Sequence, residues 1–133
     1  MLIIRAAQMK ALDEAAQETF LDYMAGDIQR RWPDRFSAIG SNVSAARISA
    51  SYRRAKGYGL RKKPHVAWFI FMDFLLGAEY ERFPGLEWAA RILQSELTAD
   101  TKVHRLTRRF DKAGISIDRI ARTQARARIN HGE

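Results

Sequence analysis

The sequence predicts an all-α fold, a single-domain bundle of about five to six helices with a long N-terminal helix and a central apolar helical hairpin. Three observations lead to this prediction. Over roughly the first thirty residues, apolar side chains recur at steps of three and four, the period of a helix with one buried face. The stretch Val66–Leu76 is apolar except for Asp73, and no other segment could pair with it as a strand. A length of 133 residues suits one domain with one core.

The first element expected is a helix over Ala6–Trp32. No proline or β-branched run interrupts it, and Pro33 ends it because the residue before a proline avoids helical angles. We expect Leu2–Ile4 to lie before it as an extended arm on the core. The residues predicted to form its buried face are Met9, Leu12, Ala16, Phe20, Tyr23, Met24, Ile28 and Trp32.

Two shorter elements should follow. Pro33–Ile39 reads as a single turn of helix, and Val43–Lys56 as a full helix after a break at Gly40. Gly57 or Gly59 supplies the left-handed residue that ends many helices. The side chains expected inside this helix are Val43, Ala46, Ile48, Tyr52 and Ala55.

The apolar stretch Val66–Leu76 could be a helix or a buried strand, since aromatic and β-branched residues favour strands. Pro64 ahead of it and Gly77 behind it are typical helix boundaries, and they favour the helix. Pro84 is expected to open the second helix of the hairpin, Gly85 to about Glu96. Whether the side around Trp68, Phe71 and Leu75 is left open for a partner is undecided, although core is the favoured interpretation.

The last major helix predicted is Thr98–Ala113, with Thr98 or Asp100 as its cap. A short further helix after Ser116, through Ile117 and Ile120, is expected before the end frays. The domain prediction is therefore a helical bundle over residues 1–115 and a basic C-terminal tail over 116–133.

Charge is distributed unevenly along the chain, whose formal net charge is +8. Arg47–Lys63 holds seven basic residues and no acidic one, and Thr101–Glu133 holds nine basic against three acidic. Val66–Asp100 between them holds six acidic residues and two basic. Such basic blocks can meet nucleic acid or an acidic protein.

Neither the composition nor the termini indicate export or a membrane. The chain has no cysteine, its first apolar run is too short for a signal peptide, and no run approaches the about 20 residues of a membrane span. We therefore expect a cytoplasmic protein with no membrane partner.

No motif in the sequence indicates catalysis, a metal or a cofactor. His65, His104 and His131 lie far apart, and no ligand pair at helical or turn spacing accompanies them. There is no glycine-rich phosphate loop and no serine nucleophile motif. We expect a protein that is not an enzyme and binds no cofactor.

Asp73 is the one residue whose chemistry demands a partner, because a carboxylate within an apolar helix must reach water or a cation. We expect it to pair with an arginine from another helix, with Arg91 and Arg53 as candidates. Glu79 and Glu81 are interpreted as acids favoured by the start of a helix rather than as a catalytic pair. The residues expected to have structural roles are Trp68, Asp73, Gly77, Pro84 and Trp88.

A partner surface is predicted at the basic blocks. Tyr52 and Tyr58 interleave the first block, which is also a pattern of nucleic-acid binding. However, Val66–Leu76 carries no polar side chains that could recognise base edges. The candidate partner-binding residues are Arg53, Arg54, Lys56, Arg61, Lys62, Lys63, Arg105, Arg108 and Arg109.

Several short motifs, in order along the chain, are shared with one family. They are LIIRAAQMKALDEAA at the start, Trp32-Pro33, Arg54-Ala55 with Tyr58-Gly59-Leu60, Leu76-Gly77, and Pro84 followed by Trp88-Ala89 and Ile92-Leu93. On these residues, about 2 to 110, the chain resembles a family of small helical accessory proteins encoded in bacterial type VI secretion effector gene clusters.

The resemblance implies a non-catalytic co-adaptor or chaperone that binds an effector toxin or its adaptor, and possible contact with the spike protein. Two other functions stay open. One is a small basic nucleic-acid-binding protein, and the other is an immunity protein to a co-encoded toxin. The positive charge argues against neutralising a basic nuclease toxin, since such inhibitors usually present acidic surfaces.

Overall fold

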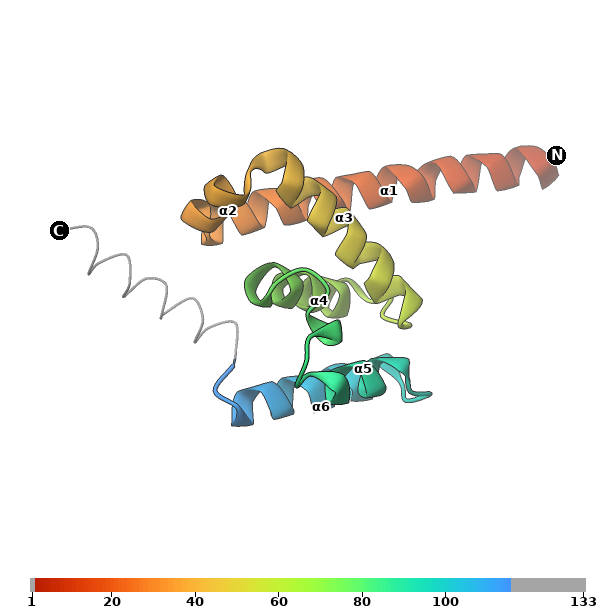
Figure 1. The fold of residues 1–133 in the computed structure, drawn as a ribbon. Helices are drawn as coiled ribbons and strands as arrows, with labels where there is room; N and C mark the ends of the chain where they lie inside the picture. Colours follow the sequence, from red (N-terminus) through yellow and green to blue (C-terminus); the bar gives the residue numbers. More distant parts are fainter. Residues whose placement is uncertain (1, 116–133) are drawn as a thin grey trace. The chain divides into compact units, whose positions relative to one another are not determined.

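The computed structural model describes the backbone of residues 2–115 and the side chains of residues 8–115. Within this range the chain forms six α-helices and one 3-10 turn and no strand, so the all-α prediction is confirmed. Figure 1 shows their order along the chain. The elements are α1 (Leu2–Arg31), α2 (Pro33–Ile39), α3 (Ser41–Gly57), α4 (Lys63–Leu76), η1 (Tyr80–Arg82), α5 (Glu87–Gln94) and α6 (Ala99–Lys112).

The chain divides into two compact units, Met1–Ile48 and Ser49–Glu133, with the division inside α3. In the first unit α2 packs against α1, after Trp32 breaks the helix ahead of Pro33. The buried side chains here include Met24, Ile28, Trp32 and Phe36.

The expectations about the start of α1 and about one side of α3 were wrong. Leu2–Ile4 is the first turn of α1 rather than an extended arm, because nothing in the sequence interrupts the helix there. Val43 and Ala46 lie on the exposed side of α3, whereas Ile48 is buried as expected.

The second unit is built around α4, the predicted apolar helix. Seven of its residues are buried, and the helix begins at Lys63 and ends before Gly77, whose φ of 129° only glycine adopts readily. The choice of helix over strand for this stretch is confirmed. Leu75 is buried, while Trp68 and Phe71 are half-buried, so the stretch is mainly core.

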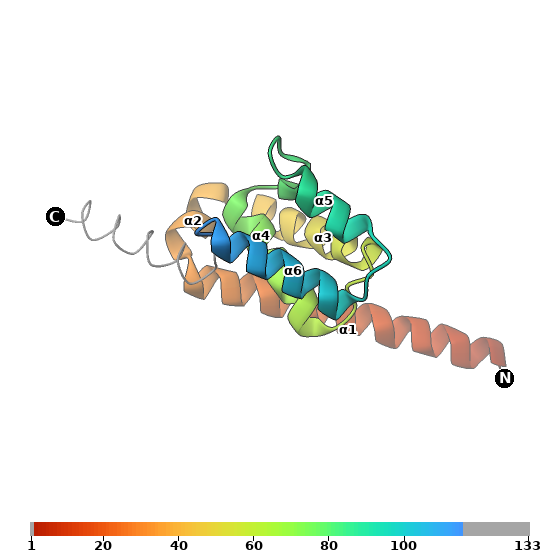
Figure 2. The same ribbon diagram turned by 90° about the horizontal axis from the view of Figure 1, so that it is seen from below.

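Helices α5 and α6 pack beside each other, and α6 also packs on α4, as Figure 2 shows from below. An aromatic cluster lies at this junction. The ring of Phe110 on α6 lies 5.0 Å from that of Trp88 and 6.1 Å from that of Tyr80, and Tyr80 lies 5.6 Å from Phe69 of α4. Edge and tilted contacts of this kind stabilise a core beyond simple burial.

The start of α6 was predicted correctly, and the start of α5 was not. Pro84 does not open α5, which begins at Glu87, because Gly85 has a φ of 90° and cannot join a helix. The hairpin instead includes η1, a short turn that was not expected. In α6 the Thr98 hydroxyl accepts the Thr101 N–H and caps the helix, as predicted. The predicted helix after Ser116 and the basic tail lie outside the described residues.

Candidate functional site

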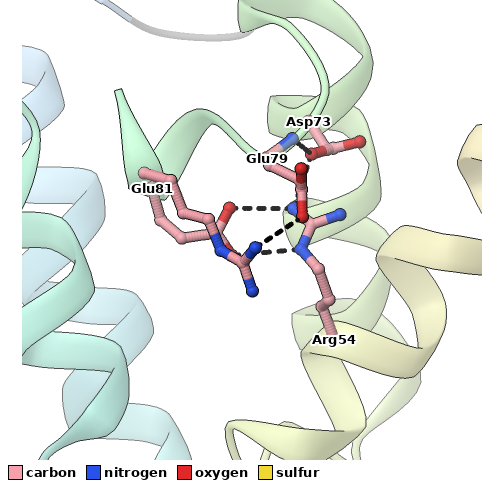
Figure 3. Close-up of polar contacts among 5 residues, drawn as sticks. Arg54, Asp73, Glu79 and Glu81 are labelled. Carbon is pink, nitrogen blue, oxygen red and sulfur yellow. Dashed lines mark hydrogen bonds and ion pairs between the residues drawn. The ribbon is translucent and has the colours of Figure 1, made fainter. Parts of the chain in front are cut away.

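The centre of the second unit holds a buried ion cluster formed by Arg54, Asp73 and Glu81. One Arg54 Nη donates to Asp73 Oδ1 at 2.6 Å and to Glu81 Oε1 at 2.8 Å, while its Nε donates to Glu81 Oε2 at 3.2 Å. Figure 3 shows the guanidinium lying between the two carboxylates, which come from α4 and η1. The Asp73 and Glu81 side chains are 2% and 0% exposed, so water contributes almost nothing to their charges.

Asp73 also fixes the turn after α4. Its Oδ1 accepts the backbone N–H of Glu79 at 2.8 Å. Glu79 has a φ of 59°, a left-handed conformation that a residue with a side chain rarely adopts. The hydrogen bond from its amide offsets part of that strain. Asp73 therefore joins three pieces of chain: α3 through Arg54, its own helix, and the turn into η1.

The electrostatics of the cluster favour ion pairing over proton transfer. Burial by itself would raise the pKa of Glu81, but the hydrogen bonds from Arg54, with those from its own backbone amide and from Tyr58, outweigh it and lower that pKa. Burial would likewise lower the pKa of Arg54, and the two carboxylates raise it instead. Burial and the neighbouring Glu81 carboxylate raise the pKa of Tyr58 to about 12. Arg54 and Glu81 are therefore held in their charged states, which suits a structural ion pair.

The expected pairing of Asp73 with an arginine from another helix is confirmed, but the arginine is Arg54. The named candidates, Arg53 and Arg91, are both exposed. Helical geometry explains the difference between the two neighbours on α3. Relative to buried Ser51, at about 100° per residue, Arg53 lies about 160° away around α3 and Arg54 only about 60° away.

Glu81 was missed as a core residue. It had been interpreted as an acid favoured by a helix terminus, yet it is 1% exposed and is bound through both of its oxygens. Its burial depends on the turn of chain at η1, which periodicity does not reveal.

The nine candidate partner-binding residues do not form one class. Arg54 is inside the ion cluster, where two carboxylates compensate its charge. The other eight are exposed: Arg53, Lys56, Arg61, Lys62, Lys63, Arg105, Arg108 and Arg109.

One of these exposed cations, Lys62, contacts a segment that is distant in sequence. Lys62 Nζ lies 3.5 Å from Asp100 Oδ2, and His65 Nε2 lies 3.0 Å from Asp100 Oδ1, so the segment before α4 lies at the start of α6. Arg105, Arg108 and Arg109 follow within about 100° of one another around α6. The three arginines therefore give α6 one basic side.

The predicted structural residues have contacts that explain four of the five. Trp68 and Trp88 pack on Phe110, and the Arg109 guanidinium lies 4.5 Å above the Trp88 ring. At Gly77 an added Cβ would lie 2.9 Å from the Phe83 ring. Asp73 belongs to the ion cluster, and Pro84 lies exposed in the turn ahead of α5.

An exposed apolar face on α1 was not predicted as a surface. Met9, Leu12 and Tyr23 are 63%, 69% and 61% exposed. They had been assigned to the same buried face as Met24 and Ile28, which are indeed buried at 1% and 0% exposure.

Helical geometry shows why that assignment was wrong. A four-residue step turns a helix about 40° past a full turn, so the five steps from Leu12 to Trp32 add about 200°. Leu12 and Trp32 therefore point to nearly opposite sides of the helix, and only the later part of the stripe is buried. The signal was present in the sequence: a run of four-residue steps, without intervening steps of three, winds around a helix instead of following one face.

The described residues provide little for other chemistry. Among residues 2–115 no group of three or more histidine or acidic side chains could hold a metal ion. No helix within the same range is both long enough and apolar enough to cross a membrane. His65 contacts Asp100, and His104 is exposed on α6.

Comparison of the chain with models of known protein families, with curated proteins and with solved structures finds no match in any of the three.

Proposed function

We propose that this chain is a non-catalytic accessory factor that binds an effector toxin, or the adaptor of that effector, in the cytoplasm before the effector is loaded onto a type VI secretion spike. The motifs shared with type VI accessory proteins support the secretion context. The observation that carries the protein-binding part is the exposed apolar face of α1, formed by Met9, Leu12 and Tyr23.

An exposed stripe of large apolar side chains at helical spacing is a recurring feature of helix-mediated protein recognition. Among the described side chains, residues 8–115, five large apolar residues are exposed, and four of them are in the first unit: Met9, Leu12, Tyr23 and Val43. Leaving them in water forgoes the stabilisation that burial gives, and surface clusters of this kind usually mark an interaction site. The ion cluster of the second unit ties α3, α4 and the turn into η1 together through buried hydrogen bonds.

The test is co-purification with the products of neighbouring genes. The tagged chain is expressed together with the effector, adaptor and spike proteins encoded beside it, and the double variant Leu12→Ser/Tyr23→Ser is compared with the unchanged chain. We expect an effector or adaptor to be retained by the unchanged chain and lost from the double variant.

Two control results give this experiment its force. Both substituted residues are exposed, so circular dichroism should show an unchanged helical content. A variant of the other unit, Arg108→Ser, should retain the partner. Failure to recover any effector, adaptor or spike protein with the unchanged chain would refute the proposal.

A second function is favoured by one observation, the exposed basic surface of the second unit. Arg105, Arg108 and Arg109 share one side of α6, and Trp88 beneath Arg109 offers a stacking surface. Nucleic-acid binding there would require an affinity that falls steeply with salt. A gel-shift titration with single- and double-stranded DNA and RNA at low salt decides it, and the absence of any shift rejects this alternative.

A further inference from the structure

The exposed face of α1 has acidic borders along its length. Around the helix axis, Met9, Leu12 and Tyr23 fall within about 60° of one another. Asp13 lies about 40° beyond Met9 on one side of this apolar face, and Asp22 lies about 80° beyond Leu12 on the other. Both acidic side chains are exposed.

The charge of this part of α1 is the opposite of the charge of the whole chain. Between Gln8 and Asp27 there are five acidic residues and one basic residue, Lys10, within a protein of net charge +8. Lys10 lies about 160° from Leu12 around the helix and so points away from the apolar face. The face is therefore apolar in its middle and acidic on both borders.

We infer that the partner segment seated on this face is a basic amphipathic helix, with an apolar stripe against Met9, Leu12 and Tyr23 and with lysine or arginine opposite Asp13 and Asp22. This inference rests on the proposed function, because it names the chemistry of the partner at the same face. Opposite charges beside an apolar seam set the choice and orientation of paired helices.

Charge complementarity also decides against a second copy of α1 as the occupant. Two copies of the same face would bring acidic borders against each other, which disfavours pairing. The extent of the face sets the size of the partner segment. Met9 to Tyr23 spans about 21 Å of helix, which a partner helix of about four turns would cover.

The test uses a single introduced thiol, because the chain contains no cysteine. Ala15→Cys places an environment-sensitive fluorophore at the border of the face, on an exposed residue. The probes are two synthetic 16-residue helical peptides with the same leucine stripe. One carries lysine on both borders of the stripe, and the other carries glutamate at the same positions.

We expect the lysine peptide to bind saturably, with an affinity that falls as salt is added. The affinity of the glutamate peptide should be at least about tenfold lower. Leu12→Ser should lower the affinity for the lysine peptide at least about tenfold, because the substitution removes apolar contact without changing charge. The double variant Asp13→Asn/Asp22→Asn should reduce the difference in affinity between the lysine and glutamate peptides. Glu96→Gln, an exposed acid of the second unit, should change neither affinity.

Several results would overturn the inference: equal affinity for the two peptides, no binding of either, or a fluorophore response that depends on protein concentration without peptide, which would indicate a second copy. A fluorophore already shielded in the dilute chain, and exposed by deletion of residues 116–133, would assign the face to the chain's own tail and equally overturn it. If neither peptide binds while co-purification still depends on Leu12 and Tyr23, the inference of a basic helical partner is refuted and the proposed function is supported.

Discussion

Replacing Arg54 with methionine tests the ion cluster most severely. The methionine keeps an unbranched stem but loses the guanidinium, which lies 5.3 Å from the Phe69 ring, together with the three hydrogen bonds that it donates to the two carboxylates. Asp73 and Glu81 then remain buried after losing the Arg54 cation. The matched control is Arg53→Met, one residue earlier on the same helix and exposed.

The magnitude follows from the burial of the two acids. Their side chains are 2% and 0% exposed, and that of Arg54 is 16% exposed, so solvent screens the interaction weakly. Removing one partner of such a buried pair destabilises a protein by about 3–5 kcal/mol. A surface substitution such as Arg53→Met should stay within about 0.5 kcal/mol.

The assay is urea denaturation followed by tryptophan fluorescence, since Trp68 and Trp88 both lie in the second unit. The loss in Arg54→Met should shrink between pH 8 and pH 5. Buried acids without a cation have raised pKa values, and protonation then relieves the cost of burying their charge. If Arg54→Met and Arg53→Met unfold within about 1 kcal/mol of each other at pH 7, the cluster does not hold this unit together.

Three further predictions are measured by the same denaturation, two in the second unit and one that compares glycines of both units. The pKa of Glu81 is lowered on folding from its ordinary 4.5, so the stability it contributes is present above about pH 4.5 and is lost as the pH falls through the folded pKa; Glu81→Gln should flatten this acid limb, and an unchanged limb contradicts the assignment. Gly77→Ala should lower the free energy of unfolding by about 2 kcal/mol or more, because of the positive φ at Gly77 and the close Phe83 ring. Gly26→Ala, in the open interior of α1, should instead raise it by about 0.5–1 kcal/mol, and equal effects of the two substitutions would refute the argument. Among the described residues the buried Tyr80 hydroxyl has no hydrogen-bond partner, so Tyr80→Phe should leave stability unchanged or raise it by up to about 1 kcal/mol, and a clear loss would reveal a partner.

The sequence predicted those elements whose boundaries are local. Pro64 and Gly77 identified α4 as a helix despite its strand-like composition, and Thr98 identified the start of α6. A proline, a positive-φ glycine and a capping hydroxyl act over one helical turn, so their meaning does not depend on the rest of the fold. Pro84 failed as a boundary because the next residue, Gly85, took a conformation outside the helical region.

The site was harder to predict because it depends on contacts between distant residues. A carboxylate such as Asp73 within an apolar helix predicts a cationic partner. Whether that partner is Arg54 or Arg53 depends on which side of α3 faces the core. Glu81 gave no local sign of its burial. The exposed face of α1 was not predicted because the apolar stripe winds around the helix. Apolar spacing identifies a helix, but it does not show which part of the stripe is covered by the rest of the protein.

The most direct measurement of the proposed function is crosslinking from the apolar face of α1 in cells that also make the proteins encoded beside this chain. Ala16→Cys, exposed and close to Leu12 around the helix, would carry a thiol-linked photoreactive group. Illumination should join the chain to an effector or adaptor encoded beside it, and adding Leu12→Ser should abolish the product. Crosslinks to none of these proteins, or a product unchanged by Leu12→Ser, would contradict the account.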